Sequence, residues 1–412
     1  MRNSWSLAVS RGRAAILFQA CLLLCFECVF AEPDPTTEIK TPVFKKHVID
    51  AVFPGIAVSA VDVDGDGLKD VVAAGGPSGS VSKWSNQVNW YKAPKWERQS
   101  VCALRVGETR EEKVVILHIR TVNFSAPAGK VAATGPAEIA VADGLQGKIW
   151  WYRYDRTAKS WSGSLIVEGV QGVHGIDVGD VDNDGYADIL VPSPRGTPKR
   201  SIIWARNPGK AIKKNQIWPR YPLSKTPVIP SHGHYVRLID INGDGRRDAL
   251  HAAQNFLGLW SQGDNPQAPW NLRKLTGPFK RATNPAAADF NGDGRIDVVM
   301  SEGHGAGVWW FPAPTFRATA IDTTLQSTHC LTLGDYNGDG RVDIATCGYE
   351  SKVVACFLNS GGTFERLDID TDQCAYDAVS TDLDNDGDID ILLAGQGSHN
   401  VVWYENIGTT GR

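Results

Sequence analysis

A nine-residue acidic motif recurs six times along the chain of 412 residues, and its first copy spans Asp62–Asp70. Each copy follows the pattern D-x-[DN]-x-D-G-x-x-D. Side-chain oxygens at positions 1, 3, 5 and 9, with the backbone carbonyl of position 7, suit a hard cation that takes 6–8 oxygen ligands. Carboxylates packed so closely would repel one another without a cation. The motif predicts calcium rather than magnesium, because magnesium gives up its water shell reluctantly.

Six such loops predict about six bound calcium ions, with ligands at the same five positions of each copy. The predicted ligands are Asp62, Asp64, Asp66, Leu68, Asp70, Asp180, Asp182, Asp184, Tyr186, Asp188, Asp240, Asn242, Asp244, Arg246, Asp248, Asp289, Asn291, Asp293, Arg295, Asp297, Asp335, Asn337, Asp339, Arg341, Asp343, Asp382, Asp384, Asp386, Asp388 and Asp390. An EF-hand would need a glutamate at position 12, where the first two copies carry Ala73 and Val191. Short apolar, β-prone runs follow the motifs, so we expect the loops to connect strands.

The spacing of the motifs predicts the architecture. The last five copies begin 60, 49, 46 and 47 residues apart, whereas the first gap is twice as long. A degenerate copy over residues 130–138 fills that gap, with Lys130 in place of the first ligand and Glu138 in place of the last aspartate. Each of the seven units also carries two aromatic-led stretches. Four strands repeated seven times predict an all-β, seven-bladed β-propeller, with its tryptophans packed between blades.

The two ends of the chain predict how the ring closes. The stretch Phe44–Ile49 resembles a fourth strand with no strands before it, and the last unit ends at its third strand, Val401–Glu405. The N-terminal strand should therefore complete the last blade, which would remove an open sheet edge.

The first 31 residues have the pattern of a signal peptide. Arg2, Arg11 and Arg13 precede the apolar run Ala14–Phe26, which is too short for a stable membrane anchor. We expect a signal peptide over 1–31, a linker over 32–43, the propeller over 44–407 and a tail over 408–412. Cleavage removes three arginines and one glutamate and changes the net charge from −4 to −6. No later segment is apolar enough to span a membrane, and no basic run suggests nucleic-acid binding. The expected location is secreted, periplasmic or extracellular.

Histidines gather at the end of the propeller opposite the acidic loops. Six residues before each motif the chain carries Ile56, Phe124, His174, His234, Thr283, His329 and Tyr376. We expect these residues at the axial end of the innermost strands. His174, His234, His329 and Tyr376 are the candidate catalytic residues. The turns after the second strands add candidate ligand-binding residues at the same rim, namely Arg195, Gln254, Glu302, His304, Tyr349, Gln396 and His399. We call these eleven residues the His-rich face.

The His-rich face is open to several interpretations. It could bind a ligand, transfer a proton beside a carbonyl or a uronate, or hold a zinc ion. It could also be an ordinary polar propeller rim. His118 and His251 lie within apolar runs and are expected to be packing residues. Cys330 and Cys347 flank the fifth complete motif symmetrically and should face each other, where a disulfide would fit an exported protein.

The motif followed by a short apolar strand resembles the FG-GAP/VCBS repeat family. The resemblance covers about residues 44–407 and implies the seven-bladed propeller of the integrin α N-terminal superfamily, with calcium in the loops. The endings Ile149-Trp150-Trp151-Tyr152 and Val402-Trp403-Tyr404 are similar to the propeller part of aldos-2-ulose dehydratase. The FG and GAP dipeptides are mostly absent. Family members range from adhesion receptors to carbohydrate-active enzymes, so the resemblance does not fix an activity.

Three functional hypotheses follow, and the third is a purely structural interaction scaffold for the cell surface. The first is a secreted, calcium-binding module that recognises a glycan or a cell-surface protein through the His-rich face. The alternative is a carbohydrate lyase or dehydratase with its active site on that face. The sequence contains no Ser-His-Asp arrangement, phosphate-binding loop or cofactor fingerprint that can be argued from its pattern.

Overall fold

The described part of the protein is built almost entirely from β-strands. The computed structural model describes residues 40–76, 86–103, 114–127, 136–198, 200–228 and 234–410. These residues form strands grouped in seven four-stranded antiparallel sheets, which are the blades. The strands are β1 (Thr41–Asp50), β2 (Gly55–Val61), β3 (Asp70–Gly75), β4 (Gln87–Lys92), β5 (Glu97–Ala103), β6 (Ile116–Val122), β7 (Glu138–Asp143), β8 (Lys148–Asp155), β9 (Ser160–Val167), β10 (Asp177–Gly179), β11 (Asp188–Ser193), β12 (Ser201–Ala205), β13 (Arg220–Pro222), β14 (Val236–Ile239), β15 (Asp248–Ala253), β16 (Phe256–Ser261), β17 (Asn271–Leu275), β18 (Ala282–Ala288), β19 (Asp297–Glu302), β20 (Ala306–Phe311), β21 (Thr319–Gln326), β22 (Thr328–Gly334), β23 (Asp343–Gly348), β24 (Val353–Asn359), β25 (Phe364–Asp370), β26 (Asp377–Thr381), β27 (Asp390–Gly395) and β28 (Asn400–Thr410), with a 3-10 turn η2 (Gly209–Ala211) after β12.

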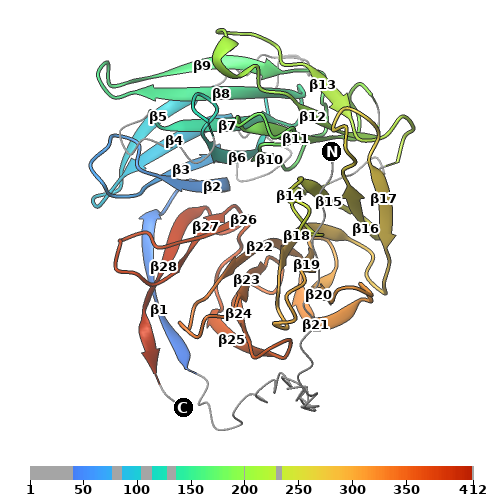
Figure 1. Cartoon of the computed structure of the whole chain (residues 1–412). Coiled ribbons are helices and arrows are strands. Elements are labelled where there is room, and N and C mark those ends of the chain that lie inside the picture. The colour runs from blue at the N-terminus through green and yellow to red at the C-terminus, as the bar shows by residue number, and fades with distance from the viewer. Residues whose placement is uncertain are drawn as a thin grey trace, which may run out of the picture. The chain divides into compact units, whose positions relative to one another are not determined.

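Blades 1 to 6 each take four consecutive strands, beginning with β2–β5 and ending with β22–β25. Blade 7 has the order β1-β28-β27-β26, so its outer strand comes from the N-terminal end of the described chain. Strand β1 lies antiparallel beside β28, with Thr41 opposite Thr410 and His47 opposite Trp403 (Figure 1). The prediction that the N-terminal strand completes the last blade is confirmed.

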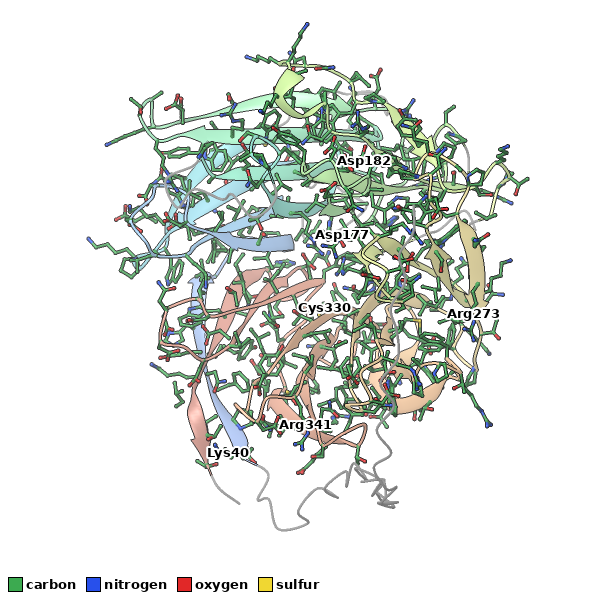
Figure 2. The ribbon with its side chains drawn as sticks, viewed as in Figure 1. Lys40, Asp177, Asp182, Arg273, Cys330 and Arg341 are labelled. Carbon is green, nitrogen blue, oxygen red and sulfur yellow. The ribbon has the colours of Figure 1, made fainter. Side chains whose placement is uncertain are left out.

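The innermost strands of the blades form a closed ring. Each of β2, β6, β10, β14, β18, β22 and β26 contacts the next, and β26 contacts β2. In Figure 2, Asp177 of β10 and Cys330 of β22 lie toward the middle of the blades, whereas Arg273 of β17 lies at the periphery. The all-β, seven-bladed propeller predicted from the repeat period is confirmed.

The core lies between neighbouring blades. The second strand of each blade is buried along its whole length, as in β3 and β11, and one apolar cluster joins Val72 of blade 1 to Ile139 of blade 2. Trp204 and Trp260 are almost completely buried, which confirms the packing role expected for the tryptophans. His118 and His251 are fully buried within β6 and β15, as expected of packing residues.

The register of the inner strands corrects one prediction. The last residue of each inner strand pairs with position 9 of the following loop, as Val61 does with Asp70 and Val122 with Glu138. By this register Leu117, not Phe124, is equivalent to Ile56. Phe124 lies on the side of the acidic loops because the loop of blade 2 is longer than nine residues. The ring at the opposite end consists of Ile56, Leu117, His174, His234, Thr283, His329 and Tyr376.

Cys330 lies directly opposite Cys347 in the β22–β23 pair, as the sequence predicts. Both thiols are free, and the Cys347 thiol donates a hydrogen bond to the carbonyl of Gln373 at 3.1 Å. The predicted signal peptide and residues 130–135 of the degenerate loop lie outside the described residues. Within the described ranges no helix is long and apolar enough to cross a membrane.

Candidate functional site

Four histidines of the His-rich face form a continuous cluster. The ring centroids of His174 and His234 are 5.0 Å apart, those of His234 and His304 are 5.3 Å apart, and those of His304 and His329 are 4.5 Å apart. Three of these histidines occupy the equivalent position of β10, β14 and β22, just before or at the start of the strand. His304 joins them from the turn between β19 and β20. The register therefore brings together residues that lie far apart in the sequence.

Aromatic and amide groups extend the cluster toward blade 7. The ring of His329 stacks on that of Tyr376 at 4.5 Å and 21°, and Tyr349 approaches His329 at 6.1 Å. The Tyr349 hydroxyl donates a 2.6 Å hydrogen bond to the Gln396 side-chain carbonyl. Tyr376, Tyr349 and Gln396 thus join the cluster, as the sequence predicts.

A pocket of about 390 Å³ opens beside this cluster. It is lined by His174, His234, Gln254, Arg281, Ala282 and His304. Sequence reasoning missed Arg281, an exposed residue that immediately precedes β18. Its signal in the sequence is its place two residues before Thr283, which is a member of the inner ring.

His329, the most buried histidine of the cluster, is uncharged at neutral pH. Burial, followed by the neighbouring His304 and His174, lowers the pKa of His329 to about 3. The Nδ1 atom of His174 lies 3.0 Å from the Gly172 carbonyl, which can only accept, so Nδ1 carries the proton. Burial also raises the pKa of Tyr349 and of Tyr376, so both phenols keep their protons. The face therefore offers the neutral imidazole of His329 together with phenol and amide groups.

The carboxylate of Glu302 is engaged in hydrogen bonds within the protein. It is buried, and one carboxylate oxygen accepts hydrogen bonds from the backbone N–H groups of Lys280 and Arg281 at 3.0 and 3.1 Å. The other oxygen accepts from the indole of Trp309 at 2.9 Å. Glu302 thus fastens the loop that carries Arg281.

Two further predicted residues lie away from the pocket lining. Arg195 is exposed, and its guanidinium packs over Gly172. His399 is exposed at the turn between β27 and β28. The turns of blades 3 and 7 therefore reach the same rim without lining the pocket beside the histidines.

The acidic loops share one folded conformation at the opposite rim. In the second loop both oxygens of Asp180 accept backbone N–H groups, from Asp184 at 3.1 Å and Gly185 at 2.8 Å. Asp240, Asp335 and Asp382 accept the equivalent pair of N–H groups. Glycine follows position 5 in every loop, and Gly185 has a φ of 89°, which only glycine adopts readily. The backbone thus turns around the first aspartate.

Carboxylates converge in three of these loops. Their ligand atoms lie within 4.8 Å of one another in the groups Asp62/Asp64/Asp66, Asp180/Asp182/Asp188 and Asp382/Asp384/Asp390. Positive side chains are drawn to the same oxygens. Lys92 pairs with Asp64 and Asp66, and Arg206 pairs with Asp182 and Asp184. Within the part of the chain that the structure describes, the histidines form no comparable group.

Two observations bear on whether these residues fit a hard cation. Asp64 Oδ1 is buried and has no hydrogen-bond partner among the described residues. Burial is the main cause that raises the pKa of Asp188 to about 8 and that of Asp343 to about 7, and neighbouring aspartates add to it. A divalent cation with oxygen ligands would offset both the burial and the repulsion, so the donor set fits calcium.

The aspartate at position 9 of the acidic motif also has a structural role that the sequence analysis missed. Both oxygens of Asp343 accept backbone N–H groups, from Tyr336 at 3.0 Å and Asn359 at 2.8 Å. The side-chain amide of Asn359 then donates to the carbonyl of Phe290 in the preceding blade at 2.9 Å. The side-chain amides of three other residues donate to a backbone carbonyl of the preceding blade in the same way, namely Asn207, Gln262 and Asn406. We call this hydrogen bond between neighbouring blades the amide clasp. The sequence signal for the amide clasp is an Asn or Gln that lies at or just after the aromatic third strand of a blade.

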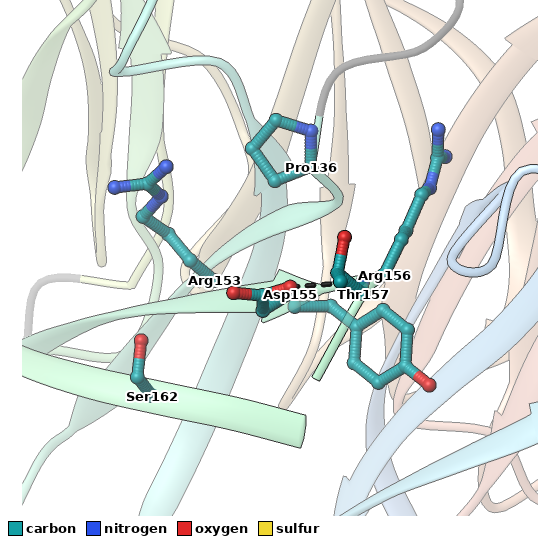
Figure 3. Close-up of a pocket in the computed structure, with 7 residues that line it drawn as sticks. Pro136, Arg153, Asp155, Arg156, Thr157 and Ser162 are labelled. Atoms are coloured by element: carbon teal, nitrogen blue, oxygen red, sulfur yellow. Dashed lines mark hydrogen bonds between the residues drawn. The ribbon is translucent and has the colours of Figure 1, made fainter. Parts of the chain in front are cut away.

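A second pocket, of about 370 Å³, lies on blade 2 (Figure 3). Its lining includes Arg153, Asp155, Arg156, Thr157 and Ser162. The Asp155 carboxylate accepts the Thr157 N–H at 2.9 Å, which shapes the turn between β8 and β9. Arg156 donates to the backbone carbonyls of Asp62 and Val63, so this pocket borders the first acidic loop.

Comparisons with known proteins agree with this architecture. A model of the FG-GAP-like repeat matches residues 133–191, 240–300 and 289–346. No protein among the curated sequences matches the chain. A solved structure of an Agrocybe aegerita lectin, which specifically recognises non-reducing terminal N-acetylglucosamine, is similar with a TM-score of 0.50 and 16% identity, over 85% of this chain and 94% of that one. The resemblance to aldos-2-ulose dehydratase stays a prediction. The chain folds as a seven-bladed β-propeller and matches the FG-GAP-like repeat in three places.

Proposed function

We propose that this propeller is a secreted, calcium-stabilised module that binds a glycan through its His-rich face. The observation that supports the proposal most strongly is the cluster of His174, His234, His304 and His329 beside a pocket of about 390 Å³. Ligand sites are concave and combine apolar or aromatic surface with a few convergent polar groups. The pocket has this composition.

The chemistry of the face suits sugar hydroxyls. Neutral imidazoles, phenols and amides each donate and accept hydrogen bonds, as sugar hydroxyls do. The stacked pair of His329 and Tyr376 is buried and supports one end of the cluster. The Gln254 amide and Arg281 supply polar groups in the pocket. The Agrocybe aegerita lectin has a similar fold and binds a sugar, which supports a glycan as the ligand class. Its terminal N-acetylglucosamine is a sensible first ligand to test.

The lyase alternative receives less support from the geometry. A general acid or base works best with a pKa near the operating pH. Burial lowers the pKa of His329 far below neutrality. Glu302, the carboxylate predicted for this face, uses both oxygens to hold backbone and indole N–H groups. Binding therefore accounts for the arrangement more simply than proton transfer does.

Calcium is the second part of the proposal. Asp180, Asp182 and Asp188 would hold the ion in the second loop, and the equivalent residues would do so in the other five. Bound calcium would supply positive charge that stabilises the folded loops, since ions that bind only the folded state stabilise it by mass action. Elemental analysis of the purified chain should find about six calcium ions. Zinc found in the same analysis would favour a metal site on the histidines and the lyase alternative.

Glycan binding is tested by a matched pair of histidine variants. A glycan array that includes terminal N-acetylglucosamine identifies a ligand, and titration calorimetry then measures its affinity. His304→Ala removes an exposed residue of the pocket lining and should weaken binding about 10-fold, the effect of about 1.4 kcal/mol. His399→Ala, at the same rim but outside the pocket lining, should bind as the wild type does. If both variants and the wild type bind the glycan with equal affinity, the glycan does not bind in the pocket beside the histidines. If the chain captures a cell-surface protein and no glycan, the ligand is a protein.

A further inference from the structure

A separate pocket of about 380 Å³ lies on the propeller axis. The inner strands of six blades contribute to its lining, which includes Arg120 and Arg237 together with the hydroxyl-bearing Ser59, Thr121, Thr332 and Ser380. No aspartate or glutamate is among its described lining residues. We call it the axial pocket. It lies between the His-rich face and the acidic loops, because its residues come from the middle and the loop-side end of the inner strands.

The register shows that both arginines occupy one equivalent position of the ring. That position is held by Ser59, Arg120, Asp177, Arg237, Ala286, Thr332 and Val379 in blades 1 to 7. In three blades its side chain accepts a hydrogen bond from the backbone N–H of the next blade. Ser59 accepts from Thr121 at 3.3 Å, Asp177 from Leu238 at 2.8 Å, and Thr332 from Ser380 at 3.0 Å.

Arginine cannot continue this pattern, because a guanidinium only donates. Arg120 and Arg237 therefore stand where three other blades place an acceptor. The equivalent N–H groups of the following blades belong to Val178 and Ala287, which have no side-chain acceptor among the described residues. Two guanidinium groups thus occupy positions of the ring where other blades place an acceptor for the next blade.

The nearby carboxylates do not neutralise the two arginines by direct contact. Asp177 points one oxygen at the Leu238 N–H, and Asp377 points one at the Val58 N–H at 3.1 Å. The Arg237 guanidinium donates to the Val236 carbonyl at 3.1 Å and to the Asn284 side-chain carbonyl at 3.0 Å. Arg120 donates to the Ile119 carbonyl at 3.1 Å. No ion pair joins either arginine to a carboxylate in the described ranges, and most of their five N–H donors remain available.

Two like charges in one pocket are costly unless an anion lies between them. Burial, and then the charge of Arg120, lower the pKa of Arg237 from its usual value, and the charges of Asp177 and Asp377 offset part of this shift. Arginine nevertheless stays protonated in proteins. Its planar fork of donors matches the oxygens of carboxylates, sulfates and phosphates.

We propose that the axial pocket is a binding site for a small oxyanion, held between the guanidinium groups of Arg120 and Arg237. A pocket of about 380 Å³ accommodates an inorganic oxyanion or a small organic acid such as a uronate. The polar side chains of Thr121 and Ser380 also line the pocket. This site is distinct from the His-rich face, and its existence does not depend on the proposed function.

Titration calorimetry of the calcium-loaded protein tests the site, with chloride holding the ionic strength constant. Sodium sulfate, acetate and glucuronate are the probes. Sulfate alone binding would identify an inorganic anion, and acetate or glucuronate binding would identify a carboxylate. Hydrogen bonds to charged groups contribute about 1.5–3 kcal/mol, so Arg120→Gln and Arg237→Gln should each weaken saturable binding roughly 10- to 100-fold. Arg317→Gln, an exposed residue between β20 and β21, should bind as the wild type does.

Two further variants keep the test decisive if a glutamine variant folds poorly. Arg120→Lys and Arg237→Lys keep the charge but lose the fork, and each should bind more weakly than the wild type and more tightly than its glutamine counterpart. The proposal is overturned if none of the three anions binds the wild type saturably. It is also overturned if folded Arg120 and Arg237 variants bind as tightly as Arg317→Gln.

Discussion

Replacing Glu302 by glutamine separates its structural role from a role on the His-rich face. The wild-type carboxylate accepts three hydrogen bonds, two at one oxygen and one at the other. Glutamine keeps a single oxygen, so its NH₂ group must face either the Trp309 indole or the N–H groups of Lys280 and Arg281. One or two bonds at about 1.5–3 kcal/mol each are lost and a buried donor is left unsatisfied. We expect Glu302→Gln to lower the free energy of unfolding by about 2–5 kcal/mol.

Equilibrium unfolding in urea, followed by tryptophan fluorescence, measures this change. Glu350→Gln is the matched control, because Glu350 is exposed at the turn between β23 and β24. Its unfolding midpoint should stay within error of the wild type. Once a glycan has been identified, folded Glu302→Gln protein should still bind it. A variant that unfolds as the wild type does but loses binding or turnover would refute this reasoning and return Glu302 to the functional residues.

Three more predictions concern the acidic loops, the buried His251 and the amide clasp of Asn406. Chelation with EGTA should lower the melting temperature and calcium should restore it, since each site at 100-fold excess over its Kd contributes about 2.7 kcal/mol; an unchanged melt would contradict calcium binding in the loops. Burial lowers the pKa of His251 to about 3, so the unfolded state binds one more proton between about pH 6.5 and pH 3 and stability falls as the pH falls through that window. His251→Leu should therefore unfold at a lower pH than the wild type in an acid titration monitored by circular dichroism, and an earlier acid transition would argue against this. Asn406→Ala leaves the Tyr336 carbonyl without its 2.8 Å partner and should lower the free energy of unfolding in urea by about 1–3 kcal/mol. Asn385 is exposed and its amide donates to the Gly67 carbonyl at 3.0 Å. Asn385→Ala should therefore lower the free energy of unfolding by less.

The sequence predicted the fold well because the repeat fixes it many times over. Seven units with one strand pattern leave few alternatives, and the unpaired fourth strand at Phe44–Ile49 correctly predicted the closure with β28. The prediction failed at Phe124, where the loop of blade 2 departs from nine residues. Counting back from a degenerate motif assumes a fixed loop length. That assumption holds only where the backbone N–H groups of the loop donate to its first aspartate.

The site was predictable in position more than in role. Register alone placed His174, His234 and His329 at one end of the inner ring. In the structure they form one cluster with His304, which contacts His234 and His329. Register could not show that Glu302 turns toward backbone N–H groups, because its partners come from the loop before β18. The contribution of Arg281 also depends on the path of that loop. Side-chain direction at a turn depends on packing between blades, which the repeat pattern does not encode.

Equivalent positions in the repeat separate structural from functional residues. Position 9 of the loops is an aspartate or glutamate in every unit, and its carboxylate holds backbone N–H groups in each described blade, as Glu138 does even where the rest of the loop is degenerate. A residue type shared by all seven units therefore answers a need common to all seven. Two other ring positions differ from blade to blade. The position at the His-rich face holds Ile56 in blade 1 and His174 in blade 3, and the position at the axial pocket holds Arg237 in blade 4 and Ala286 in blade 5. The fold does not require a histidine or an arginine at these places, because other blades manage without one. Binding chemistry that serves the molecule as a whole is a sufficient reason for them, and the two rings are where it should be sought.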